Sequence, residues 1–325
     1  MQTLLKNTDA YRLLTIERDE KRLSHAYLIL MDDDRSLRET LVEFAKIFFA
    51  CEKQSDDFSL TRTAELISKE SFCDCLFYPK KDKKFTVADA DEIKEESSLN
   101  PVEADKKLFV IGDFATLGVA QQNKLLKFLE EPPKNVYFLL GATTSYPILQ
   151  TVLSRAKKLE ILPFPESEVL SFLRRNYPDK AQNIEEMKVF AATCGGSVGT
   201  AQNALEGGYF SELIQDAFAL CLETKELPVL AKKLGDSKRK KELISFLRLI
   251  FRDATLIKTN ADPFFLLLRT DKEKTQKVAT MYSLNALLYA QERLTDAEKQ
   301  LKFNTNFAQC LELCFESIKK RNLKE

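Results

Sequence analysis

The sequence predicts an α/β domain, with a parallel sheet flanked by helices, followed by a region built only from helices. Three observations predict it: short apolar runs alternate with helical patterns over the first 160 residues, two prolines follow, and only helical patterns occur beyond them. Alternating strands and helices are typical of a parallel sheet whose faces the helices cover. At 325 residues, the chain is long enough for two or three domains.

Five short apolar runs are the predicted strands, because such runs between polar stretches are typical of strands buried on both faces. They are residues 26–30, 75–78, 108–111, 136–140 and 159–162. Between them, residues 36–50 and 119–130 place apolar side chains along one face of a helix. Strand and helix therefore alternate through the first half of the chain.

Pro163 and Pro165 mark the predicted end of the α/β domain, because each proline disfavours helix at the residue before it. Beyond them, the helical period predicts helices over 166–176, 184–193, 197–206, 210–223, 226–234, 238–259, 276–294 and 296–319. The glycine pair 207–208 predicts a second break within this helical region.

Composition and charge exclude several classes of protein. The 49 Lys plus Arg balance 49 Asp plus Glu, and 44% of the residues are hydrophobic, so the chain is neither disordered nor a polyelectrolyte. No apolar run approaches the ~20 residues of a membrane span, and the first residues lack the pattern of a signal peptide. We therefore expect a cytoplasmic protein that does not enter a membrane.

The seven cysteines and the single histidine, His25, argue against a metal site. An odd number of irregularly spaced cysteines predicts free thiols. Cys73 and Cys75 have one residue between them, fewer than zinc sites usually have, and Cys51 would be only a third ligand. We expect no bound metal.

Two positions where an ATPase would hold nucleotide carry unsuitable residues. The loop 31–38 has the place of a phosphate-binding loop, but it contains no Gly and no Lys and offers three carboxylates, which would repel a triphosphate. We expect an acidic turn in which Asp34 or Ser36 caps the following helix. Asp113, after the strand 108–111, would be a weak magnesium ligand alone, so a surface or capping role is favoured. We expect no cofactor.

Two basic stretches, 79–84 and 238–241, are candidates for contact with a phosphate backbone. Lysine-rich turns are more often simply solvated, and we favour that interpretation for both.

Two charged features have two interpretations each. Glu130 and Glu131 end the helix 119–130, where the helix dipole disfavours each carboxylate by roughly 0.3–1 kcal/mol. Such a conflict indicates a nonlocal partner, or else an exposed helix end that Pro132 stops. Arg155, in a loop before the last strand, is either a surface residue or a cation that acts on another chain.

Three strings of residues together resemble the AAA+ clamp-loader subunits of bacterial replication. They are SHAYL at 24–28, QNKLLKFLEEPP at 122–133 and TVLSR at 151–155. The pattern NxLLKxLEEPP followed by TxxSR is specific to this family, and weaker similarities at 195–201 and 251–253 extend the resemblance through the chain.

The resemblance implies three parts: an AAA+ core over residues 1–163, a small helical lid over 164–207 and an all-α collar for oligomerisation over 208–325. In the family, ATP lies between subunits, and the arginine of a Ser-Arg-Cys motif completes the neighbour's site. Here Ser154 and Arg155 are kept, while an alanine replaces the cysteine. The resemblance therefore implies that Arg155 is an arginine finger acting in trans, with Ser154 beside it.

The departures from the family pattern concern nucleotide and zinc. Loop 31–38 lacks the phosphate-binding pattern, Gly112–Asp113 replaces the acidic magnesium-binding pair, and Thr200 stands where ATP-binding relatives carry an arginine. The family's four-cysteine zinc module is also absent in that form, which leaves the fold of the insert 52–75 open. These departures imply a subunit without ATP hydrolysis of its own.

By resemblance, the chain completes a neighbouring ATPase site in the DNA polymerase III holoenzyme and helps to load the sliding clamp on primed DNA. The implied partners are ATPase subunits of the tau or gamma type, the delta subunit, the clamp and primed DNA. Two alternatives are an active ATPase with a degenerate phosphate loop, and the clamp-opening delta subunit. Retention of Ser154 and Arg155 favours the non-hydrolysing subunit over the clamp-opening one.

Overall fold

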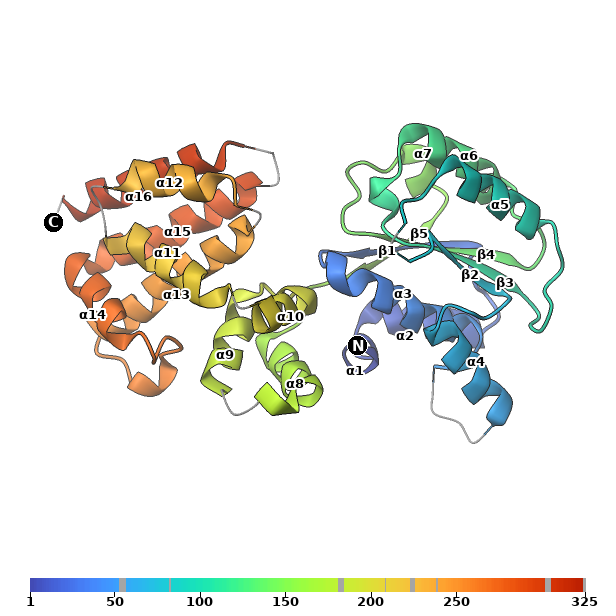
Figure 1. The fold of residues 1–325 in the computed structure, drawn as a ribbon, viewed down its shortest axis with the longest axis horizontal. Helices are drawn as coiled ribbons and strands as arrows, with labels where there is room; N and C mark the ends of the chain where they lie inside the picture. Colours follow the sequence, from blue (N-terminus) through green and yellow to red (C-terminus); the bar gives the residue numbers. More distant parts are fainter. Residues whose placement is uncertain are drawn as a thin grey trace. The chain divides into compact units, whose positions relative to one another are not determined.

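The computed structural model describes residues 1–52, 57–81, 83–180, 184–207, 209–222, 226–237, 239–301 and 305–323. The chain divides into two compact units, Met1–Phe164 and Pro165–Glu325 (Figure 1). A further division of the second unit into lid and collar stays a prediction, and residue 208 of the predicted break lies outside the described residues.

The first unit contains a five-stranded sheet in which neighbouring strands are parallel. The strands are β1 (Ala26–Met31), β2 (Cys75–Tyr78), β3 (Lys107–Ile111), β4 (Val136–Ala142) and β5 (Lys157–Ile161). Their spatial order is β2-β3-β4-β1-β5, so consecutive strands along the chain are joined by crossovers. The predicted fold class, a parallel sheet flanked by helices and followed by a helical region, is confirmed.

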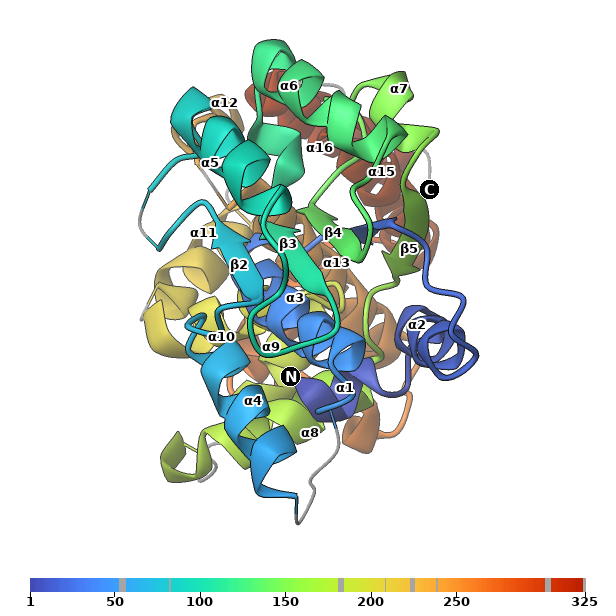
Figure 2. The ribbon, with the colours of Figure 1, turned by 90° about the vertical axis from the view of Figure 1, so that its right-hand side faces the viewer.

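Helices cover both faces of this sheet (Figures 1 and 2). On one face lie α5 (Val87–Ser97), α6 (Val119–Glu130) and α7 (Gln150–Leu153). On the other lie α1 (Gln2–Leu5), α2 (Asp9–Asp19), α3 (Asp34–Phe48) and α4 (Phe58–Ser68). Successive strand side chains point to opposite faces, so two separate layers of apolar side chains are buried.

The layer under α5, α6 and α7 contains a row of aromatic rings. Tyr78, Phe109 and Phe138 come from the adjacent strands β2, β3 and β4, and their ring centroids are 6.5 and 5.4 Å apart. Phe128 of α6 lies 6.2 Å from the Phe138 ring and extends the row into the helix layer. Aromatic pairs at such distances add to the stability that their burial gives, and here they fix α6 to the centre of the sheet.

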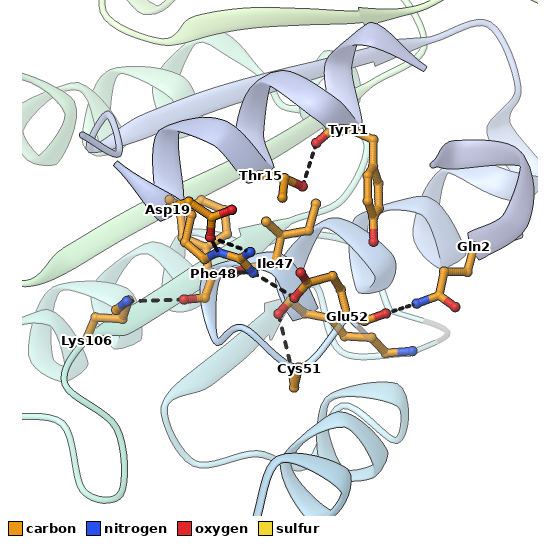
Figure 3. A network of polar contacts seen from close by, with 11 residues as sticks. Gln2, Tyr11, Thr15, Asp19, Ile47, Phe48, Cys51, Glu52 and Lys106 are labelled. Atoms are coloured by element: carbon orange, nitrogen blue, oxygen red, sulfur yellow. Dashed lines mark hydrogen bonds and ion pairs between the residues drawn. The ribbon is translucent and has the colours of Figure 1, made fainter. Parts of the chain in front are cut away.

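On the opposite face, a buried ion pair fastens α2 to the end of α3. Arg18 Nη1 lies 2.7 Å from Glu52 Oε2, and the two side chains are only 11% and 3% exposed. Figure 3 shows the network around Glu52, whose carbonyl oxygen also accepts a hydrogen bond from the Gln2 side chain. Glu52 begins the insert 52–75, of which residues 53–56 lie outside the described part, so this carboxylate joins the start of the insert to the core.

Each described regular element of the second unit is a helix. The α-helices are α8 (Glu166–Asn176), α9 (Ile184–Thr193), α10 (Val198–Gly207), α11 (Phe210–Leu222), α12 (Leu227–Gly235), α13 (Lys240–Lys258), α14 (Lys272–Met281), α15 (Leu284–Leu301) and α16 (Phe307–Asn322). Helices α11 to α16 share one buried apolar cluster. Among the described residues, no helix combines the length and the apolar character that a membrane span requires.

Two predicted helices of the second unit are wrong in their bounds. Residues 276–294 form two helices, because the Ser283 hydroxyl accepts a hydrogen bond from an amide of the next turn and starts α15. The helix predicted over 296–319 is likewise divided between α15 and α16, and Asn306 caps the start of α16. Residues 302–304 lie outside the described part. Serine and asparagine are preferred helix caps, a signal that the continuous apolar period concealed.

We expect Glu52→Ala to lower the free energy of unfolding by about 3 kcal/mol, because it leaves the buried Arg18 guanidinium without that carboxylate. Equilibrium urea unfolding, followed by circular dichroism, measures the change. Glu20→Ala is the matched control: it removes the partner of the exposed Arg22 and should lower the free energy of unfolding far less than Glu52→Ala does. Equal stability of the two variants would contradict a structural role for the buried pair.

Candidate functional site

The strings of residues that carry the resemblance meet around α6, although they are far apart in the sequence. His25, just before β1, donates from Nε2 to the Leu129 carbonyl oxygen at 2.9 Å and so satisfies a carbonyl group of the last helical turn. Glu130, the last residue of α6, pairs with Arg155: Oε1 and Nη2 are 2.9 Å apart. The structure thus brings segments 24–28, 122–133 and 151–155 together.

Arg155 follows the short helix α7, whose C-cap residue is Ser154. Its Nη1 donates to the Thr151 carbonyl oxygen at 3.0 Å and to Ser154 Oγ at 3.2 Å, while Nη2 faces Glu130. The Arg155 side chain is 35% exposed. The predicted residues Ser154 and Arg155 therefore lie in contact, and the guanidinium is both oriented by its own chain and accessible to solvent.

The ion pair gives Glu130 the nonlocal partner that its position in the helix indicates. A carboxylate in the last turn of a helix is disfavoured by the dipole, and the guanidinium beside it offsets that cost. Glu131 is the C-cap residue of α6, and its backbone N–H donates to the Lys127 carbonyl oxygen. The two adjacent glutamates thus have different surroundings.

Gln122 is a residue of the site to which the sequence analysis gave no role. Its side chain is 1% exposed and makes three hydrogen bonds to backbone. Nε2 donates to the carbonyl oxygens of Leu117 at 2.9 Å and Pro147 at 3.0 Å, and Oε1 accepts from the Leu149 N–H at 2.9 Å. Leu149 is the N-cap residue of α7, so this amide fixes the start of the short helix whose C-cap residue is Ser154. Its spacing could have indicated that it is buried, because position 122 falls on the same helix face as the apolar residues Leu125 and Leu129.

The connection after β1 is too short for a wide phosphate-binding loop. β1 ends at Met31 and α3 begins at Asp34, so only two residues lie between them. Asp33 is the N-cap residue, and its Oδ1 accepts from the Ser36 N–H at 3.1 Å. The prediction that Asp34 or Ser36 caps this helix is therefore wrong: Asp33 has the extended backbone that a cap requires, whereas Asp34 is already helical.

Asp113 lies at the same edge of the sheet, after β3. It has a left-handed backbone with φ of 32° and is the N-cap residue of the short helix η1 (Phe114–Thr116), although its side chain makes no cap hydrogen bond there. Of the predicted surface or capping role, the structure shows a half-buried residue at a cap position. Burial raises the pKa of its carboxyl group, and the Asp34 carboxylate raises it further. Both acidic side chains line a cavity of about 600 Å³, and the basic side chains of Arg38, Lys83 and Lys84 line it as well.

Comparison with known proteins gives the family. A family model described as DNA polymerase III, delta subunit, matches residues 6–165 of the chain. These residues belong to that family. The predicted resemblance to bacterial clamp-loader subunits is thereby confirmed.

Relatives of this chain include subunit delta' of DNA polymerase III from Bacillus subtilis. It is 30% identical over 181 residues, which cover 53% of this chain and 54% of that protein. Subunit gamma from Buchnera aphidicola (subspecies Schizaphis graminum) is 29% identical over 117 residues, 35% of this chain and 32% of that protein. A gamma subunit-related protein from Thermotoga maritima is 17% identical with a TM-score of 0.40, covering 97% of this chain and all of that one. The chain thus spans about half or less of the two curated relatives.

The three cysteines considered as zinc ligands, Cys51, Cys73 and Cys75, have surroundings that differ from those of metal ligands. Burial raises the pKa of the Cys51 thiol to about 11 and that of Cys75 well above its ordinary value, which disfavours the thiolate that zinc requires. The exposed Cys73 thiol lies 3.5 Å from the Glu103 carboxylate. Within the described ranges, no three His, Cys, Asp or Glu side chains are grouped so that they could hold a metal.

The other predicted residues have contacts within their own surroundings. Thr200 lies in the first turn of α10, where its N–H donates to Ser197 Oγ at 3.0 Å. In the basic stretch 79–84, Lys80 Nζ lies 5.0 Å from the Tyr78 ring centroid. In the stretch 238–241, the Arg239 guanidinium covers the Tyr209 ring. Residues 82 and 238 lie outside the described part of these stretches.

We expect Gln122→Ala to lower the free energy of unfolding by about 2–4 kcal/mol, since it leaves buried backbone groups of two loops without partners. Urea unfolding measures the loss, and faster hydrogen exchange of the Leu149 amide reports it locally. Asn123→Ala, at the next and exposed position of α6, is the matched control and should change neither. Unchanged exchange at Leu149 would contradict the role of the Gln122 amide.

Proposed function

We propose that this chain is a delta prime-type subunit of a DNA polymerase III clamp loader, a cytoplasmic protein that does not hydrolyse ATP itself. It acts by placing Arg155 in the ATP site of a neighbouring subunit, with Ser154 orienting the guanidinium. Its partners are ATPase subunits of the tau or gamma type and the delta subunit, and the assembly loads the sliding clamp on primed DNA. In this proposal, residues 1–163 are the AAA+ core, 164–207 the lid and 208–325 the collar.

The observation that carries the proposal is the presentation of Arg155. The guanidinium is oriented by Thr151 and Ser154 from its own short segment, yet about a third of the side chain is exposed. The guanidinium stands at the end of a four-residue helix, so its exposed edge is open to contact with another chain. An oriented and accessible guanidinium suits the bidentate recognition of a phosphate group on another chain.

Such an arginine acts on the charge that develops during phosphoryl transfer. As the bond to the γ-phosphate breaks, negative charge spreads over oxygens that water stabilises poorly in a closed interface. A guanidinium held in advance near those oxygens stabilises the transition state without reorganisation. In other systems that contribution amounts to about 10³–10⁵ in rate.

The short connection after β1 supports the view that the chain's own ATP site is inactive. Phosphate binding at a helix N-terminus uses free backbone amides, but here the Asp33 carboxylate already accepts one of them. Asp34 and Asp113 add negative charge at the same edge. This arrangement favours the proposal over an active ATPase with a degenerate loop, and the retained Ser154–Arg155 contact favours it over the clamp-opening subunit.

We expect Arg155→Ala to abolish hydrolysis at the one ATP site that this chain completes, by about 10³-fold or more at that site. The measurement is clamp- and DNA-stimulated ATPase activity of the reconstituted complex, with assembly checked by gel filtration. Arg12→Ala, which removes an exposed arginine of α2, is the control and should leave the rate unchanged. Unchanged hydrolysis in an intact Arg155→Ala complex would overturn the proposed function.

We expect the purified chain to bind a fluorescent ATP analogue no more tightly than a nonspecific protein, because the Asp33 carboxylate already accepts a hydrogen bond from an amide at the start of α3 and loop 31–38 has no glycine. Fluorescence anisotropy with magnesium present measures the affinity. An Arg35→Lys variant, which adds a lysine to loop 31–38, should bind equally weakly because the three carboxylates remain. Saturable micromolar binding by the wild-type chain would instead support the active-ATPase alternative.

A further inference from the structure

The ion pair between Glu130 and Arg155 joins the end of α6 to the end of α7. The two side chains are 47% and 35% exposed, and Glu130 Oε1 lies 2.9 Å from Arg155 Nη2. Because both groups remain partly in water, the pair is a weak one. A contact of this strength holds the guanidinium in place, yet a more highly charged anion can replace it.

Glu130 differs in kind from the other two acceptors of the guanidinium. Thr151 and Ser154 belong to the same short segment as Arg155, and they offer a neutral carbonyl and a neutral hydroxyl oxygen to Nη1. Glu130 comes from another helix and offers a full negative charge to Nη2. The neutral contacts can therefore persist beside a bound phosphate, whereas two anions on the same edge of one guanidinium would repel each other.

We propose that Glu130 is a positioning residue that holds the Arg155 guanidinium until the γ-phosphate of a neighbour's nucleotide displaces it. This inference rests on the proposed function. The carboxylate keeps the guanidinium close to its working orientation while the neighbouring site is empty. It also competes with the nucleotide, so ATP binding at that interface includes the breaking of the Glu130–Arg155 pair.

The competition predicts a specific kinetic signature. The pair is broken both in the ATP-bound ground state and in the transition state, so its removal strengthens binding equally in the two. In Glu130→Gln, the amide keeps the shape of the side chain and loses the charge. We therefore expect the KM for ATP to fall about two- to fivefold, with kcat changed by less than about twofold.

The experiment is an ATP titration of the steady-state ATPase activity of the reconstituted complex, with assembly verified for each variant. Glu131→Gln, at the adjacent C-cap position, is the matched control and should leave KM and kcat unchanged. Because Arg155→Ala removes hydrolysis at this site, the double variant is tested by the binding of a non-hydrolysable ATP analogue to the complex: adding Glu130→Gln to Arg155→Ala should leave that affinity unchanged, because its partner is gone.

Two results would overturn the inference. An unchanged or higher KM in Glu130→Gln would show that the carboxylate does not compete with nucleotide. A lower kcat at constant KM would show that Glu130 stays on the guanidinium in the transition state. If either result occurs while Arg155→Ala still loses hydrolysis, only this inference is overturned. If Arg155→Ala retains hydrolysis, the proposed function itself is overturned.

Discussion

The buried amide of Gln122 connects two loops that would otherwise leave backbone groups unsatisfied. Leu117 lies in the segment after β3, and Pro147 and Leu149 lie in the segment after β4. Because β3 and β4 are adjacent and parallel, both segments leave the sheet at its carboxyl edge. One side chain of α6 therefore sets the starting points of both α6 and α7, and the place of Arg155 depends on that.

Helix α6 transmits this constraint across the sheet. Its first turns, which contain Gln122, lie near the carboxyl edge, and it ends near the amino end of β1, where His25 donates to the Leu129 carbonyl oxygen. Phe128, in the last turn, packs against Phe138, which stacks on Phe109. With both ends of α6 fixed in this way, Glu130 lies where it can meet Arg155.

The strands and most helices were predictable from sequence because burial imposes a regular period, as in AYLIL at 26–30. The contacts of the site were less predictable from the sequence. Arg155 was found through a motif, but its pairing with Glu130 depends on where two helices end in space. The choice of Asp33 as cap depends on which of three consecutive carboxylates has extended backbone. Gln122 was overlooked because one polar residue on an apolar helix face does not disclose its acceptors.

The site combines a firmly held backbone with a guanidinium group that is held weakly. Gln122 is buried and satisfied three times, so the backbone that carries α7 has little freedom. The guanidinium of Arg155 is held by contacts at the surface, which water weakens. This division suits the role proposed for Arg155, contact with a second chain. A fixed backbone keeps the loss of conformational entropy on assembly small, and a weakly held charge leaves the contact free to change. A buried Glu130–Arg155 pair would have oriented the arginine more firmly, but breaking it would have cost more than a neighbour's phosphate could readily offset.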